Sequence, residues 1–197
     1  VGTEDNRMFR EVAALGEDLK KLSPIVGAET PAKVGIIYDW ESRWALDAAN
    51  GPSQFTKDHD AAMLAHYKPF WKMGVPVDFL NGDSILDGYS IVIAPQLYLL
   101  REGFAERVEK FVATGGKFVA TYLTGIANET DLVFTGGLPG PLREVLGIQA
   151  EEIDYIYEDE RNALSICSAN SPSGLEGTFE LANVCDVVRA ETAEVIG

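Results

Sequence analysis

Residues 33–39, KVGIIYD, form a short and continuous aliphatic run, which predicts a strand buried on both faces of its sheet. Three later stretches are similar: VPVDFL (75–80), YSIVIAP (89–95) and KFVATYL (117–123). Strands buried on both faces are typical of parallel sheets, because helices cover the two faces of such a sheet. The four runs therefore predict four parallel strands.

Two helical patterns lie between these runs. Before the second run, four apolar residues share one face of a helix that Gly74 ends: Met63, Tyr67, Phe70 and Trp71. We expect Pro69 to kink or break this helix, because its ring clashes with the carbonyl group of Ala65. Before the fourth run, the same stripe recurs at Phe104, Val108, Phe111 and Val112. Right-handed crossovers then predict an α/β fold with a doubly wound, mostly parallel sheet of the flavodoxin-like type.

The two ends of the chain have other patterns. Residues 5–22 predict a helix capped by Asp5, with one apolar stripe at Met8, Val12, Leu15, Leu19 and Leu22. Residues 23–32 lack periodicity and read as a linker, so this helix stands apart from the rest. Beyond the fourth run, Pro141 begins a short helix that Gly147 ends. The acid-rich residues 150–160 should be solvated or face a basic partner, and the tail from residue 177 predicts strands that extend the sheet or form a small antiparallel flank.

Composition restricts the class of protein. The 197 residues are 46% hydrophobic and 24% charged, which suits one globular domain, or one domain with an appendage. The net charge of −15 repels nucleic acid and anionic lipid, so neither nucleic acid nor a membrane is an expected partner. No secretory leader and no apolar run of membrane-spanning length is recognisable, so we expect a soluble, cytoplasmic protein. The chain begins at Val1 rather than at a methionine, which suggests a fragment of a longer protein.

Neither a cofactor site nor a metal site is predicted. Cys167 and Cys185 have no second Cys or His at ligand spacing, and TGGLPGP (135–141) lacks the lysine and hydroxyl of a phosphate loop. His59 and His66 are about two helical turns apart, too far to share a metal easily, and we expect both at the surface or its boundary. The turn TYLTGIANET (121–130) has no cysteine or serine where an amidotransferase nucleophile would stand.

Four acids could lie near one edge of the sheet: Asp39, Glu41, Asp78 and Asp83. Paired carboxylates can perform acid–base chemistry, but solvated loop carboxylates are the commoner case. We therefore predict no catalytic residue in this chain.

Several segments, in this order, resemble the trimerisation domain of the family 42 glycoside hydrolases, the bacterial β-galactosidases. They are YDWESRWALDAANGPS (38–53), VDFL (77–80), APQLYLL (94–100) and the continuous stretch 111–148. The last 14 residues of that stretch, TGGLPGPLREVLGI, are the most specific part. The resemblance is secure over residues 33–165.

The resemblance implies a fold similar to class I glutamine amidotransferases without their nucleophile, and a role in forming a homotrimer. It also implies a parent enzyme that hydrolyses terminal non-reducing β-D-galactose residues in β-D-galactosides by a retaining mechanism with two glutamates. Both glutamates belong to a catalytic barrel that is absent here, so the fragment should be inactive. Residues 1–24 resemble the terminal helix of that barrel with the start of a linker, and residues 25–197 form the trimerisation domain.

A different function remains open from the residues alone. The chain could be a free-standing amidotransferase-like or carbohydrate-binding domain that lacks the nucleophile. The trimerisation domain predicts a barrel of some 200–400 residues upstream, so the presence of such a barrel would distinguish it from a free-standing domain.

The candidate inter-subunit site consists of Asp39, Trp40, Glu41, Arg43 and Trp44. These residues follow the first strand, at the edge where open α/β sheets receive a ligand or partner. Tryptophan and arginine dominate the binding energy of protein interfaces. Alternatively, both indoles pack inside their own loop, under NGPSQF (50–55), and the sequence leaves both alternatives open.

Overall fold

The computed structural model describes residues 3–50, 57–157, 159–166 and 175–196. The chain divides into two compact units, residues 1–31 and residues 32–197. The first unit contains helix α1 (Arg7–Lys21) and the short 3-10 helix η1 (Ser23–Ile25). No residue of α1 is buried, and the predicted apolar stripe, which ends at Leu22, is between 50% and 74% exposed.

The expectation that Asp5 caps α1 is wrong. The cap is Asn6, whose side chain accepts a hydrogen bond from the backbone N–H of Phe9 at 2.8 Å. Asp5 instead pairs with Arg10 at 2.8 Å. Asparagine and aspartate cap helices about equally well, so the residue adjacent to the first turn takes the role.

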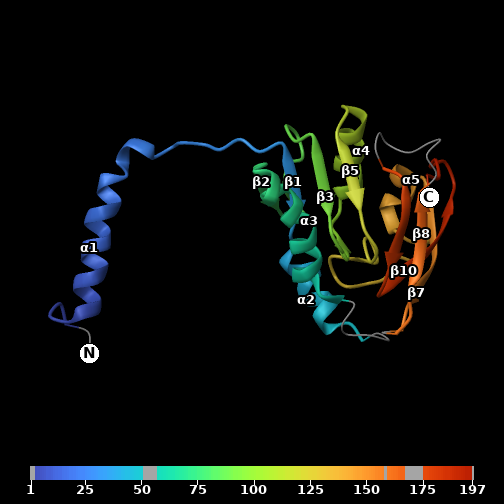
Figure 1. Ribbon diagram of the computed structural model, residues 1–197, viewed down its shortest axis with the longest axis horizontal. Coiled ribbons are helices and arrows are strands. Elements are labelled where there is room, and N and C mark those ends of the chain that lie inside the picture. Colours follow the sequence, from blue (N-terminus) through green and yellow to red (C-terminus); the bar gives the residue numbers. More distant parts are fainter. Residues whose placement is uncertain (1–2, 51–56, 158, 167–174, 197) are drawn as a thin grey trace. The chain divides into compact units, whose positions relative to one another are not determined.

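The second unit contains a four-stranded sheet formed by β1 (Val34–Ile37), β2 (Val77–Leu80), β3 (Ile91–Ala94) and β5 (Lys117–Ala120). Each strand lies within one of the four predicted runs, and the order across the sheet is β2-β1-β3-β5 (Figure 1). All three pairings are parallel, with Ile36 between Phe79 of β2 and Ile93 of β3. The predicted α/β fold with a mostly parallel sheet is confirmed.

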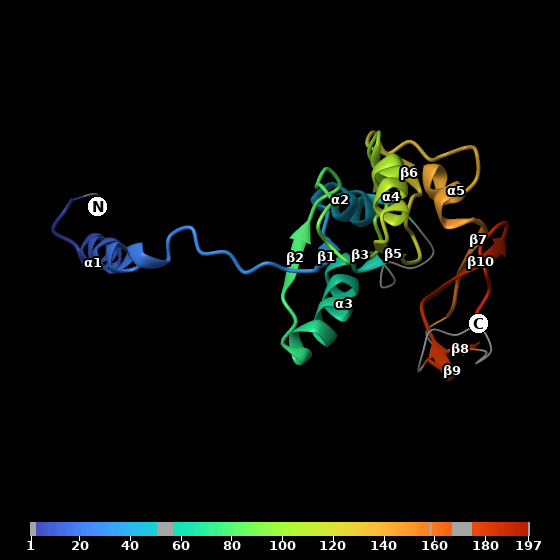
Figure 2. The ribbon, with the colours of Figure 1, turned by 90° about the horizontal axis from the view of Figure 1, so that it is seen from above.

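Helices lie on both sides of this sheet (Figure 2). Helix α3 (His59–Met73) contacts β1 and β2, whereas α4 (Phe104–Ala113) lies on the opposite side and contacts β5. Phe104, Val108 and Phe111 of α4 are buried as predicted, but Val112 is exposed. The main core lies beneath α4 and includes Ile37, Leu80, Val92, Ala94, Leu97 and Leu142.

Several local expectations between β1 and β2 are wrong. The segment 39–44 that carries the two tryptophans, expected as a loop, instead belongs to helix α2 (Trp40–Ala48), whose first turn Asp39 caps. A break at Pro69 is wrong, because α3 continues to Met73 and stops at Gly74 in the left-handed conformation, whereas a kink at Pro69 stays a prediction. Packing against the sheet supplies most of the stability of such a helix and outweighs the hydrogen bond lost at the proline. Trp71 is exposed, whereas Met63, Tyr67 and Phe70 of the same predicted stripe are half-buried.

The remaining elements are short. Strands β4 (Leu99–Leu100) and β6 (Ala127–Asn128) pair in parallel, and η3 (Gly140–Leu142) leads into α5 (Arg143–Leu146), which Gly147 ends as predicted. Strands β7 (Ile148–Tyr155) and β10 (Val184–Ala190) form one antiparallel pair. Strands β8 (Asn162–Ile166) and β9 (Gly177–Leu181) form another, so the tail takes the form of an antiparallel flank.

Two other sequence observations have structural counterparts. Cys185 is half-buried and free, whereas Cys167 lies outside the described residues. In the part of the chain that the structure describes, no helix has the length and apolarity needed to cross a membrane.

Candidate functional site

The segments at the carboxyl ends of β1 and β2 meet around the carboxylate of Asp39. This side chain caps α2 by accepting a hydrogen bond from the backbone N–H of Ser42 at 2.9 Å. It also accepts one from the backbone N–H of Gly82 at 3.3 Å and one from the Arg101 guanidinium at 2.8 Å. Asp39 is only 1% exposed. Burial alone would raise the pKa of Asp39, but these hydrogen bonds and the charge of Arg101 outweigh burial and hold the pKa below its ordinary value.

Arg101 connects three segments through one guanidinium group. Besides Asp39, it pairs with Glu41 at 2.6 Å and lies 3.4 Å from a carboxylate oxygen of Asp83. Its side chain is 19% exposed, and a Cβ atom on Gly82 would overlap the guanidinium. Burial alone would lower the pKa of Arg101, but the surrounding carboxylates raise it. Arg101 is therefore the cation that organises this part of the molecule.

The sequence analysis missed Arg101, although a signal for it exists. The arginine directly follows the apolar run Leu97–Leu100, which ends in the short strand β4. Its partners could not be named, because Asp39 is 62 residues away along the chain.

The four acids expected near this edge do not form a catalytic pair. Asp39, Glu41 and Asp83 converge on Arg101, whereas Asp78 accepts a hydrogen bond from the Tyr89 hydroxyl at 2.9 Å. A carboxylate held by a cation is stabilised in its charged form and is a poor proton donor near neutral pH. The arrangement thus serves structure rather than acid–base chemistry.

Tyr38, Trp40 and Trp44 form a cluster that we call the aromatic platform. The ring centroids of Tyr38 and Trp40 are 5.3 Å apart, and those of Trp40 and Trp44 are 6.0 Å apart. The guanidinium carbon of Arg43 lies 5.0 Å from the Trp40 centroid, and Arg43 also pairs with Asp60 at 2.8 Å. Trp40 is 52% exposed and Trp44 is 60% exposed. Two indole side chains of the platform are therefore exposed on the surface of this unit.

A hollow of about 450 Å³ lies beside the aromatic platform. Its lining is formed by Asp39, Trp40, Glu41, Trp44, Asn81 and Arg101. Four of the five predicted interface residues therefore line this hollow. The fifth, Arg43, lines a separate hollow that includes Asp47, Lys57 and His59. The alternative in which the indoles pack under residues 50–55 lies largely outside the described residues.

The other candidate positions carry no catalytic constellation. At the turn after β5, Leu123 has a φ of 58°, a left-handed conformation that is uncommon for a leucine, and the neighbouring Thr124 hydroxyl donates to the carbonyl of Ala94 at 3.3 Å. The expectation that His59 lies at the surface or its boundary is wrong, because His59 begins α3 and is buried against Tyr38. Burial lowers the pKa of its imidazole. Within the described residues, no three His, Cys, Asp or Glu side chains are grouped so that they could hold a metal ion.

Comparison with known proteins identifies the class. A family model described as "Beta-galactosidase trimerisation domain" matches residues 32–197. The chain therefore belongs to the β-galactosidase trimerisation domain family. It is 47% identical over 196 residues to the β-galactosidase BglY of Alicyclobacillus acidocaldarius and 44% identical over 195 residues to the β-galactosidase Pbg of Clostridium perfringens. These matches cover 100% and 99% of this chain but only 28% of each relative.

Solved structures show the same relationship. The β-galactosidase from Rahnella sp. R3 has 47% identity and a TM-score of 0.83, with coverage of 98% of this chain and 28% of that chain. Gan42B, a GH42 β-galactosidase, has 39% identity and a TM-score of 0.78, with coverage of 98% of this chain and 27% of that chain. The chain thus spans between a quarter and a third of the length of these four proteins.

Proposed function

We propose that this chain is the non-catalytic trimerisation part of a longer β-galactosidase. The longer protein is a cytoplasmic, cofactor-independent enzyme that removes terminal non-reducing β-D-galactose residues from β-D-galactosides by a retaining mechanism. Its nucleophile and its acid–base residue are two glutamates of a barrel outside this chain. Two observations support the proposal: the relatives named β-galactosidases are more than three times as long, and the acids of the candidate site are held by Arg101.

The finer fold assignment is also a proposal. We infer a flavodoxin-like fold of the class I amidotransferase kind without the nucleophile, which the strand order β2-β1-β3-β5 and the leucine at position 123 support. We assign residues 1–24 to the last helix of the barrel and the start of the linker, and residues 25–197 to the trimerisation domain. The exposed apolar stripe of α1 supports this assignment, because such a stripe requires a partner.

One half of the contact between subunits of a homotrimer is formed by Asp39, Trp40, Glu41, Arg43 and Trp44. In a closed three-fold ring each subunit uses two different surfaces, so this half meets a different patch on its neighbour. The observation that carries the proposal is the pair of exposed indoles on the aromatic platform, next to the buried pair of Asp39 and Arg101. An indole already held in place loses little conformational entropy on binding and covers some 150–250 Å².

The neighbouring patch should be neutral or basic. The chain carries a net charge of −15, so two like surfaces of this domain repel each other. A surface of the neighbouring catalytic barrel can supply the complementary charge, and we propose that barrel as the second partner.

The test is the Trp44→Ala variant of the intact enzyme, measured by sedimentation. The expected loss is about 2 kcal/mol of association free energy, roughly a thirtyfold weaker trimer, and activity falls if the platform borders the neighbour's substrate pocket. Trp71→Ala is the matched control, because Trp71 is an equally exposed indole on α3, outside the aromatic platform. A Trp44→Ala enzyme that remains folded, trimeric at nanomolar concentration and fully active would show that the platform serves only its own domain.

A further inference from the structure

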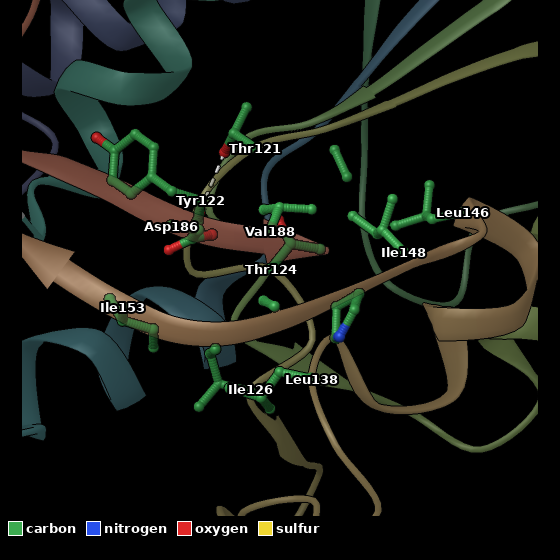
Figure 3. Close-up of a pocket in the computed structure, with 13 residues that line it drawn as sticks. Thr121, Tyr122, Thr124, Ile126, Leu138, Leu146, Ile148, Ile153, Asp186 and Val188 are labelled. Atoms are coloured by element: carbon green, nitrogen blue, oxygen red, sulfur yellow. Dashed lines mark hydrogen bonds between the residues drawn. The ribbon is translucent and has the colours of Figure 1, made fainter. Parts of the chain in front are cut away.

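A second cavity, of about 190 Å³, lies between the turn after β5 and the antiparallel pair of β7 and β10 (Figure 3). Most of its lining is aliphatic and includes Ile126, Leu146, Ile148, Ile153 and Val188. Figure 3 shows these side chains around the cavity, with Asp186 and Tyr122 at one end of it. The cavity adjoins the carboxyl end of β5, the kind of position where open α/β sheets bind small molecules.

Asp186 is the unexpected member of this lining. It lies on β10 opposite Ile153 of β7, on the side of the strand pair that also presents Ile148, Ala150 and Val188 to the cavity. Among the described residues that line the cavity, Asp186 is the only one with a charged side chain. A charged residue on an apolar face requires a physical reason, because burying a carboxylate without a partner is costly.

The carboxylate of Asp186 has an unfilled position for a donor. Its Oδ1 atom is buried, although the residue as a whole is half-buried, and it has no hydrogen-bond partner among the described residues; burial raises the pKa of Asp186. The hydroxyls of the lining are engaged elsewhere: Thr121 donates to the carbonyl of Tyr122 at 3.2 Å, Thr124 donates to the carbonyl of Ala94 at 3.3 Å, and the Tyr122 hydroxyl is hydrogen-bonded to the side chain of Gln96. A donor that carries a positive charge would therefore satisfy the carboxylate best.

We propose that this cavity binds a primary ammonium group carried on a short aliphatic stem. The ammonium donates to Oδ1 of Asp186, and the stem packs against Ile153 and Val188. Two sources offer this chemistry, namely a free alkylamine and the side chain of a lysine from a neighbouring protein surface. The inference concerns a site separate from the aromatic platform and does not depend on the proposed function.

The probe is n-butylammonium chloride, titrated into the 197-residue chain while the methyl signals of Ile153 and Val188 are followed by NMR. 1-Butanol has nearly the same shape without the charge, and sodium butyrate has the opposite charge. We expect saturable shifts with butylammonium, binding of butanol at least tenfold weaker, and no binding of butyrate. Equal affinity for butylammonium and butanol, or shifts that do not saturate, would overturn the proposal.

Two variants separate the charge from the cavity. Asp186→Asn keeps the shape and removes the charge, so it should remain folded and lose at least tenfold in affinity for butylammonium while butanol binding stays unchanged. Ala150→Leu fills part of the cavity and leaves Asp186 in place, so it should block both probes. Butylammonium binding that survives Asp186→Asn contradicts the proposal whatever the Ala150 variant does.

The intact enzyme distinguishes the two sources. If a free amine is the natural ligand, butylammonium binds the intact enzyme and Asp186→Asn leaves its assembly unchanged. If a neighbouring lysine is the ligand, butylammonium produces no shift in the intact enzyme and Asp186→Asn weakens its assembly. Either result supports the ammonium site, whereas failure of butylammonium to bind the 197-residue chain refutes it.

Discussion

Replacing Arg101 with methionine tests whether one guanidinium group organises the candidate interface. Methionine keeps an unbranched, mostly apolar stem but removes the cation that pairs with Asp39, Glu41 and Asp83. Asp39 then remains buried with only the backbone donors of Ser42 and Gly82. Removing one partner of a buried ion pair costs about 3–5 kcal/mol. Because two donors remain and the Arg101 side chain is 19% exposed, we expect the lower end, about 3 kcal/mol.

The assay is urea unfolding of the 197-residue chain at pH 7, compared with that of Arg189→Met. Arg189 also pairs with carboxylates, Glu151 at 2.7 Å and Glu191 at 3.6 Å, but its side chain is 52% exposed. Exposed ion pairs contribute about 0–1 kcal/mol, so the control should lose little. The loss in Arg101→Met should exceed the loss in Arg189→Met by a factor of at least three.

The pH dependence gives a second readout. The pKa of Asp39 is lowered in the folded protein, so its contribution to stability is present above its unfolded pKa, about 3.9, and is lost as the pH falls through the lower folded value. In Arg101→Met, the pKa of Asp39 should be higher than in the original chain, because the carboxylate is buried without the cation. Protonation of Asp39 at low pH then removes the cost of burying its charge. The stability difference from the original chain should therefore shrink below about pH 4. The reasoning is refuted if the two arginine variants lose equally at pH 7, or if the Arg101 loss is the same at pH 7 and pH 3.5.

Two further predictions concern the chain as a whole. The purified chain should not cleave a chromogenic β-galactoside, and turnover that persists through repurification would contradict the proposed absence of the catalytic glutamates. Deleting residues 1–31 should change the free energy of unfolding of residues 32–197, measured with urea, by less than about 0.5 kcal/mol, because no residue of α1 is buried. Amide exchange that shows α1 as the most protected element would contradict this second prediction.

The sheet was predictable because each of its strands carries a local signal. The runs around Ile36 and Ile93 are continuously apolar, and β1 and β3 lie within them. The stripe of Phe104, Val108 and Phe111 likewise identifies α4 and its buried face. Trp71 shows the limit of this approach, because an apolar residue at helical spacing can still face outward when the neighbouring positions already cover the sheet.

The candidate site was predictable in its residues but not in its architecture. Trp40 and Trp44 attract attention in the sequence as aromatics that follow a buried strand, and the structure places both in the aromatic platform. The helix that carries them was missed, because its start depends on Asp39 acting as a cap, and a carboxylate after a strand can equally be a loop residue.

The sequence by itself determined the four strands, the helix stripes and the resemblance to the trimerisation family, because these depend on periodicity and order along the chain. Only the tertiary structure decided that Arg101 neutralises Asp39, 62 residues away, and that Asp186 lies beside an aliphatic cavity next to the turn after β5. Both features depend on which loops the fold brings together. No periodic pattern in the sequence identifies the partner of a charged residue. The protonation state and the energy of that residue depend on its burial and its neighbours, which exist only once the chain is folded.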